Sequence, residues 1–528
     1  MSGLIFYNGN IYTLDKKRPY AEAIAIQGNR IMALDEGMKN LSQKSFKKIN
    51  LRGKTVLPGF IDSHTHFVSF AKSLNLLDLD ECQSLEETLK KLQVFAKKKN
   101  KTEWILARRW NINLWKKQIL PGKVILDKIS ATNPIVIFSK DGHSLWANSK
   151  VLEIAKIDES TPDPSGGRIE RYSNSHEPSG ILREKACDLV YKIIKEPEEN
   201  ILAQLLKEAF KLAHQKGIVG IHDCEDEKAL ELFESFQQKD ELALRVFMMI
   251  PQKNLDEAIK MGFKTGLGNE YLKIGGVKIF ADGALGSRTA LMFKPYNLEP
   301  KNLGVEVNSQ KDLLESVKKA SQNQLSVAIH AIGDKANHQT LNAIEKGNHN
   351  QKLRHRIEHV QVLDPRDISR FAQLDIIASM QPIHGPSDRD MAEKYWGKRS
   401  QLAYAFKTLL NKGAKLAFGS DLPLYDFDPL KGIYSAVTRK GGIKDSSWNP
   451  KEKISVAQAV DAYTKGAAYA SYEENLKGSL ETGKLADMVV LSKDIFKIAP
   501  DELLKTKFLA TLWDGKIVYN DDFLELSD

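Results

Sequence analysis

Residues 57–66 read Leu-Pro-Gly-Phe-Ile-Asp-Ser-His-Thr-His, an apolar segment that ends in two histidines. Short apolar segments of this kind, bounded by turn residues, are typical of buried strands. Seven more follow along the chain, and stretches of helical periodicity such as 200–215, 311–322 and 335–346 lie between most of them. We predict strands at 56–62, 218–223, 243–250, 273–281, 325–332, 355–361, 375–382 and 415–420.

Eight strands that alternate with helices favour an α/β fold of the (β/α)8 TIM-barrel type over an open doubly wound sheet. The predicted barrel region, residues 58–477, is longer than the roughly 250 residues of an ordinary barrel. The excess lies at about 67–199, which holds strand candidates of its own and a loop rich in Gly, Pro and Ser. We therefore predict an insertion there that forms a lid or a subdomain.

The two ends of the chain differ from its middle. Both carry short apolar strands broken by Asn-Gly, Gly-Asn or Asp-Gly pairs, which are turn signals. Neither end alone is long enough to bury the face of a sheet. We predict one small β-sandwich that is built from residues 1–57 and 478–528, with the barrel inserted between them. The edges of such a sandwich could pair two subunits into a homodimer.

The composition of the 528-residue chain is that of a soluble globular protein, with 42% hydrophobic and 27% charged residues. No apolar run is long enough for a membrane span, and the start lacks the pattern of a signal peptide. The three cysteines are too few and too scattered for a disulfide framework, so we expect a cytoplasmic protein. The net charge of +9 is spread over short lysine runs that are interleaved with acids, which is typical of a solvated surface and argues against a nucleic-acid site.

The active site of a (β/α)8 barrel lies at the carboxyl ends of its strands. In an extended segment, residues two apart point to the same side, so His64 and His66 can offer nitrogens to one metal ion. Other strands carry or end in further ligand types, which suit Zn²⁺, with Mn²⁺ or Fe²⁺ as alternatives. Each residue also has a structural interpretation. The histidines could be buried hydrogen-bonding groups, Lys278 could form an ion pair with Asp282 or Glu358, and Asp421 could cap the helix that follows it. These further candidates are Lys278, His330, His359 and Asp421.

This order of residues inside a terminal β-sandwich resembles the amidohydrolase superfamily. More narrowly, it is similar to the amidohydrolase 3 branch, which includes N-substituted formamide deformylases. The resemblance runs along nearly the whole chain. Its motifs lie at residues 57–66, 141–148, 278–288 and 478–491.

The resemblance implies a site with two divalent metal ions, in which a CO₂-derived carbamate on Lys278 bridges both. A charged lysine has no lone pair to donate, whereas a carbamate is an anion with two oxygens. By this resemblance, one metal is held by His64, His66, the Lys278 carbamate and Asp421. The other is held by the same carbamate, His330 and His359.

The resemblance also implies that His143, within the predicted insertion, points into the pocket and contacts the substrate or the developing oxyanion. Asp421 is the expected general base and then acid. Further candidates for substrate contact are Trp110, His222, Asp282, Arg288 and His384.

The function we expect is hydrolysis of a C–N bond in a small amide, formamide or cyclic amide, by a hydroxide held between the two metals. One alternative is deamination of a nucleobase-like ring by a mononuclear relative, although those relatives typically lack the bridging lysine. The other alternative is a non-catalytic protein that uses the barrel for binding.

Overall fold

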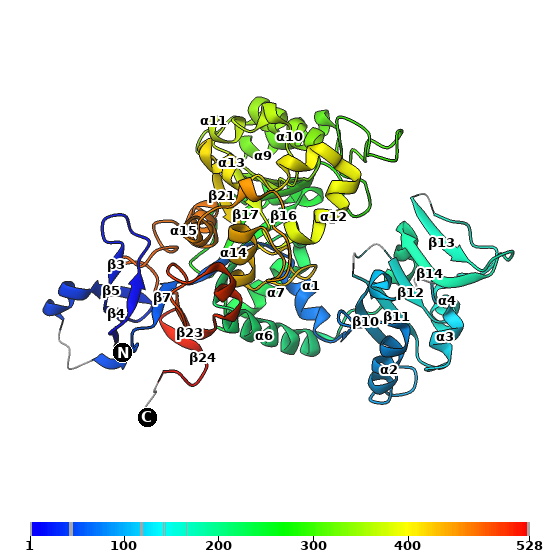
Figure 1. Cartoon of the computed structure of the whole chain (residues 1–528), viewed down its shortest axis with the longest axis horizontal. Helices are drawn as coiled ribbons and strands as arrows, with labels where there is room; N and C mark the ends of the chain where they lie inside the picture. The colour runs from blue at the N-terminus through cyan, green and yellow to red at the C-terminus, as the bar shows by residue number, and fades with distance from the viewer. Residues whose placement is uncertain are drawn as a thin grey trace. The chain divides into compact units, whose positions relative to one another are not determined.

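The computed structural model describes residues 3–41, 46–116, 120–140, 142, 144–164 and 166–524. The chain forms two compact units (Figure 1). One comprises Met1–Val68 together with Phe210–Asp528, and the other comprises Ser69–Ala209. The second unit corresponds to the insertion that the sequence places at about 67–199.

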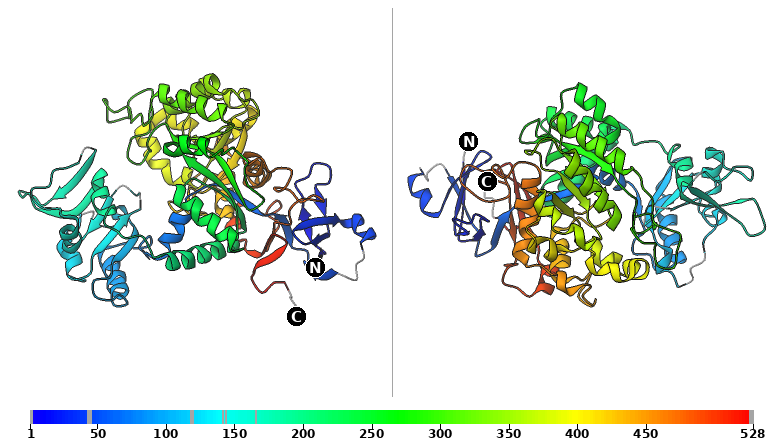
Figure 2. Two further views of the ribbon diagram at one scale, coloured as in Figure 1. Left: turned by 180° about the vertical axis from the view of Figure 1, so that it is seen from behind. Right: turned by 90° about the horizontal axis from the view of Figure 1, so that it is seen from above.

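The first unit contains a sheet of eight parallel strands, in which each strand pairs with the next along the chain. A bridge between Thr65 and Leu422 joins the first strand to the segment after the last one, which brings the sheet close to a closed barrel. Figure 2 shows this barrel from two further sides. Its strands are β8 (Phe60–Thr65), β15 (Ile218–Asp223), β16 (Arg245–Pro251), β17 (Leu272–Phe280), β18 (Val327–Ala331), β19 (Arg356–His359), β20 (Ile377–Met380) and β21 (Lys415–Phe418).

Helices follow the barrel strands, and the predicted (β/α)8 class is confirmed. The three helices expected from periodicity are present, and no predicted bound differs from the observed one by more than one residue. The helices of the first unit bury their apolar faces against the outer side of the strands, as Leu313 and Val317 of α9 do. The longer helices are α6 (Glu199–Gln215), α7 (Glu227–Gln238), α9 (Gln310–Gln322), α10 (Asp334–Gly347), α12 (His384–Trp396) and α14 (Pro429–Thr438).

The prediction of a single first strand at 56–62 is wrong, because the segment divides at Gly59. Strand β7 (Thr55–Pro58) pairs with a C-terminal strand of the sandwich, and only β8 enters the barrel. A Cβ on Gly59 would lie 2.5 Å from both methyl carbons of Val219 in β15. Glycine at this position therefore lets the chain pass close to β15 as it moves from one sheet to the other.

Both ends of the chain build the predicted β domain. A four-stranded sheet contains β1 (Gly3–Tyr7), β4 (Ile24–Gln27), β5 (Arg30–Leu34) and β6 (Phe46–Asn50). A six-stranded sheet places N-terminal beside C-terminal strands (Figure 1), and apolar side chains of both sheets share one core. In sheet order its strands are β24 (Lys516–Asn520), β23 (Phe508–Trp513), β22 (Met488–Leu491), β7, β2 (Asn10–Tyr12) and β3 (Tyr20–Ala21).

The second unit has its own mixed sheet and its own apolar cores. Helix α2 (Leu85–Ala96) begins at an N-cap, Ser84, whose side chain accepts a hydrogen bond from the amide of Glu87. In sheet order the strands are β13 (Gly167–Arg171), β14 (Pro178–Glu184), β12 (Ser144–Ala147), β11 (Ile135–Ser139), β10 (Ile105–Trp110) and β9 (Leu77–Asp78).

Among the described residues, no helix has the length and apolar character that crossing a membrane requires. The three cysteines, Cys82, Cys187 and Cys224, are free thiols and all are buried.

Candidate metal centre at the carboxyl ends of the barrel strands

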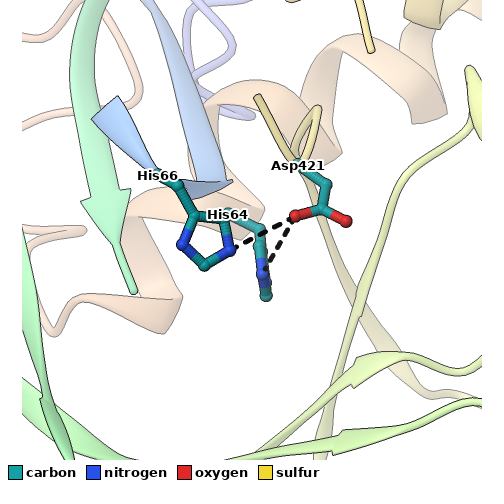
Figure 3. Close-up of side chains that lie close together, drawn as sticks. All are labelled: His64, His66 and Asp421. Carbon is teal, nitrogen blue, oxygen red and sulfur yellow. Dashed lines mark ion pairs between the residues drawn. The ribbon is translucent and has the colours of Figure 1, made fainter. Parts of the chain in front are cut away.

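His64, His66 and Asp421 lie together at one end of the barrel (Figure 3). The Oδ1 atom of Asp421 is 3.6 Å from His64 Nε2 and 3.5 Å from His66 Nε2. Each of the three residues offers one atom to a group whose members all lie within 4.8 Å of one another. Two imidazoles and one carboxylate at this spacing form a set of ligands suited to a divalent metal ion.

Backbone hydrogen bonds hold this group in place where the barrel closes. The amide of Asp421 donates to the carbonyl of His64 over 2.8 Å, and the amide of His66 donates to the carbonyl of Leu422 over 2.8 Å. The buried carboxylate of Asp62 accepts from the amides of His64 and Ser420, at 3.2 and 2.9 Å. Strands β8 and β21 are thus joined at the level of the ligands.

The remaining predicted ligands lie at the same end. The ring centroid of His359 is 4.8 Å from that of His64 and 4.5 Å from that of His330. The Nζ atom of Lys278 is 3.2 Å from His64 Nε2. All six side chains that the sequence predicts as metal ligands therefore converge on one mouth of the barrel.

Three histidines of the site have one ring nitrogen engaged outside it. His64 Nδ1 lies 2.5 Å from Glu358 Oε2, His330 Nε2 lies 2.9 Å from the carbonyl oxygen of Gly283, and His359 Nδ1 lies 2.9 Å from Gln381 Oε1. Metal-binding histidines typically donate their second ring N–H to such an acceptor, which fixes the tautomer. The other nitrogen of each ring keeps a lone pair for a cation.

Lys278 is buried, with 3% of its surface exposed, yet within the described part of the chain it forms no ion pair with a carboxylate. The two carboxylates that could pair with this lysine, Asp282 and Glu358, have other partners. A buried ammonium without a counter-ion is costly. A carbamate on Nζ would instead place an anion among the metal ligands, so Lys278 fits the predicted bridging group.

Electrostatics favour the ligating forms of these side chains. Burial, followed by the charge of Lys278, lowers the pKa of both His64 and His330 to about 4, so both rings are neutral at pH 7. Burial also lowers the pKa of His359 well below its usual range. Burial alone would raise the pKa of Asp421, but the hydrogen bond from His66 and the nearby rings of His64 and His359 hold it well below its usual range.

The backbone at two ligands lies in the left-handed region, with φ of +73° at His359 and +61° at Asp421. Non-glycine residues with such φ values are uncommon and are found preferentially at functional sites. Here the turn after each strand directs the side chain into the mouth of the barrel.

Three other candidates are buried and have partners in the protein. His222 Nδ1 lies 2.8 Å from Arg356 Nη1 inside the barrel. The carboxylate of Asp282 accepts from the amides of Leu291, Ile332 and Gly333, so it anchors two loops. His384 Nε2 lies 3.0 Å from the carbonyl oxygen of Ser420, and its ring stacks on Tyr425 at 3.8 Å between centroids. Contact of these residues with a substrate stays a prediction.

The last three candidates are Arg288, Trp110 and His143. Arg288 forms an ion pair with Glu299 and lies over the ring of Tyr395. The alternative prediction that it pairs with Asp282 is wrong, because the carboxylate of Asp282 accepts hydrogen bonds from backbone amides. Trp110 is buried in the core of the second unit beside Trp115 and Trp146. The position predicted for His143 lies outside the described residues.

Sequence reasoning did not predict two contacts with the ligands, that of Gln381 with His359 and that of Glu358 with His64. Gln381 follows β20 directly, and no pattern in the sequence distinguishes it. Glu358 carried a signal: Arg356 and Glu358 are two apart in one strand, so both charges point to the same side of β19. Opposite charges placed inside a barrel in this way indicate a buried ion pair.

The model of the amidohydrolase family matches residues 47–519. The chain belongs to the amidohydrolase family. The resemblance seen in the motifs is thereby confirmed, including the amidohydrolase 3 branch.

Curated relatives of this amidohydrolase span its length. It is 35% identical to Protein LONG AFTER FAR-RED 3 of Arabidopsis thaliana, over 98% of this chain and 92% of the relative. It is 33% identical to the putative amidohydrolase YtcJ of Bacillus subtilis, over 98% of this chain and 99% of the relative. The N-substituted formamide deformylase of Arthrobacter pascens is 24% identical, over 98% of both chains.

Among solved structures, an uncharacterized metal-dependent hydrolase from Pyrococcus horikoshii OT3 is similar, with a TM-score of 0.79 and 28% sequence identity. The match covers 94% of this amidohydrolase and 99% of that chain. The family and this neighbour support a metal-dependent hydrolase, in agreement with the cluster of His64, His66 and Asp421.

Proposed function

We propose that this amidohydrolase cleaves a C–N bond of a small amide, formamide or cyclic amide at a centre of two divalent cations, with Zn²⁺ as the metal. The observation that carries the proposal is the buried Lys278, which has no carboxylate partner in the described part of the chain and lies 3.2 Å from His64. A carbamate there, together with the free nitrogens of His64, His330 and His359, would hold two cations. Such cations lower the pKa of a coordinated water and polarise a carbonyl oxygen.

Asp421 has the properties of the proton carrier. Its carboxylate stays ionised because the imidazoles around it hold its pKa low, so it can accept a proton from water. It can then deliver that proton to the nitrogen of the leaving amine. Its place at the end of β21, beside both His64 and His66, supports this role.

The type of bond is inferred from the site and from one relative. An N-substituted formamide deformylase covers nearly the whole chain, which favours amides and formamides over other substrates. Deamination at a mononuclear site is less well supported, because Lys278 would then be a buried ammonium without a function or a counter-ion.

The proposal is tested by incubating the Zn²⁺-loaded enzyme with a panel of N-formyl and N-acyl amines and measuring amine release with an amine-reactive dye. We expect release from at least one member of the panel, and its loss in Lys278→Ala. Arg288→Gln, which removes a charge away from the ligands, serves as the control that should retain activity. Release of ammonia from aminated rings, without cleavage of any amide, would contradict the proposal.

A further inference from the structure

We propose that Glu358, held by Arg356, is a positioning residue that fixes the ring of His64 for metal binding. This inference rests on the proposed function, because it concerns a ligand of the same metal centre. It adds a residue pair that contacts neither the metal nor the substrate.

The contact between Glu358 and His64 is direct and shielded from water. Both side chains are fully buried, and Glu358 Oε2 lies 2.5 Å from His64 Nδ1. An ionised carboxylate only accepts hydrogen bonds, so the proton of the neutral ring must lie on Nδ1. The lone pair is thereby placed on Nε2, the atom that faces Asp421 and Lys278.

Arg356 holds the carboxylate in this position. Its guanidinium contacts both oxygens of Glu358, with Nε on Oε1 and Nη2 at 3.0 Å from Oε2. The acceptor of the His64 proton is thereby held in a buried ion pair.

Arg356 is in turn fixed by three further strands. Its Nη2 atom donates to the carbonyl oxygen of Ser63 in β8 and, over 2.9 Å, to Oγ of Ser379 in β20. Its Nη1 atom lies 2.8 Å from Nδ1 of His222 in β15. These contacts with β8, β15 and β20 fix the orientation of the Arg356 guanidinium. The carboxylate of Glu358, which is bound to that guanidinium, is therefore also fixed in orientation.

The same unit offers a matched control in Glu473, which is also buried and also paired with two cations. Glu473 lies 2.9 Å from Lys273 and 2.5 Å from Lys477, and it contacts none of the predicted ligands. Removing its charge should affect stability in the way that removing the charge of Glu358 does. Only Glu358 should affect metal binding.

The experiment compares Zn²⁺ affinity, measured by competition with a chromophoric chelator, for the wild type, Glu358→Gln and Glu473→Gln. We expect Glu358→Gln to weaken Zn²⁺ binding by about 10- to 100-fold, the usual effect of losing a partner of a ligand. Glu473→Gln should bind within about twofold of the wild type, by the same reasoning. Equal affinities of all three proteins would overturn the inference.

A second variant guards against misfolding, because Glu358→Gln leaves Arg356 as an unpaired buried charge. The double substitution Arg356→Met with Glu358→Met removes both charges, a change that buried ion pairs often tolerate. We expect it to fold, by circular dichroism, and still to bind Zn²⁺ about 10- to 100-fold more weakly. Wild-type affinity in this folded variant would also overturn the inference, whereas a wild-type protein that binds no Zn²⁺ would reject the proposed function itself.

Discussion

The barrel carries buried polar side chains at both of its ends, and the two sets are paired in different ways. At the amino ends of the strands, Arg245 of β16 forms ion pairs with Asp487 and Asp514 and donates to the carbonyl of Glu270. At the carboxyl ends, three imidazoles each contact an acceptor outside the site through one ring nitrogen, and Lys278 has no carboxylate partner among the described residues.

The difference separates a structural cluster from a binding site. Buried charges are tolerated when they are paired, and the amino-end cluster meets that condition within the protein. By the proposed function, the carboxyl-end cluster meets it once Lys278 carries a carbamate and cations are bound. Burial of polar groups alone does not identify a site, whereas burial with unused lone pairs does.

The largest effect is expected at the carboxyl end, from Asp421→Asn. Without an ionised group to carry the proton, kcat should fall by about 10²- to 10⁴-fold. The metal content, measured by inductively coupled plasma mass spectrometry, should stay close to that of the wild type because the other ligands remain. A variant with nearly full kcat on a substrate found in the panel would remove Asp421 from the role of proton carrier.

At the amino ends of the strands, we expect a substitution to lower the stability of the fold and to leave the metal content unchanged. Asp487→Asn removes the main counter-charge of the fully buried Arg245, and breaking a buried pair costs about 3–5 kcal/mol. Urea unfolding monitored by tryptophan fluorescence should report this loss, while the metal content of the folded protein stays unchanged. A loss of metal at unchanged stability would break the comparison between the two clusters.

His214, a buried residue away from the metal centre, should make the stability of the fold depend on pH. Burial lowers the pKa of His214 to about 4, while its Nε2 lies 2.7 Å from the carbonyl oxygen of Ala243. The unfolded chain therefore binds a proton at higher pH than the folded protein. This contribution to stability is complete above about pH 6.5 and is lost as the pH falls toward 4, by about 2 kcal/mol at pH 5.

His214→Gln should flatten this part of the stability profile, because glutamine can keep the hydrogen bond and does not titrate. The check is urea unfolding of both proteins at pH 7 and pH 5. An equal loss of stability in both would mean that other groups cause the acid sensitivity.

The smallest effect is expected for Arg288→Gln. Arg288 and Glu299 are about one third exposed, and exposed ion pairs contribute less than about 1 kcal/mol. We expect little change in the melting temperature and in KM. A KM that rises by about tenfold, equivalent to about 1.4 kcal/mol, would return Arg288 to the substrate-binding residues.

Most of the barrel could be predicted from the sequence because its strands are short apolar segments that alternate with amphipathic helices. The error in the first strand has a physical cause. The chain is apolar from Thr55 to Ile61, since it is buried in the sandwich and then in the barrel. Only the close approach of Gly59 to Val219 marks where it changes sheets.

The predicted ligands could be found because each stands at the end of a strand, where side chains of a barrel converge. Their supporting residues could not be found in this way, because Gln381 and Glu358 act through neighbours in space. Asp282 shows a structural role that the sequence did not predict. Its oxygens accept hydrogen bonds from three backbone amides, whereas its contact with substrate stays a prediction.

The central claim is that the carboxyl ends of the strands form a centre for two cations bridged through Lys278. Its most direct test is the metal content of the protein purified without chelator and in the presence of bicarbonate, measured by inductively coupled plasma mass spectrometry. The account predicts close to two divalent ions per chain, and fewer in Lys278→Ala. A wild-type protein without bound metal, even after incubation with Zn²⁺ and bicarbonate, would contradict it.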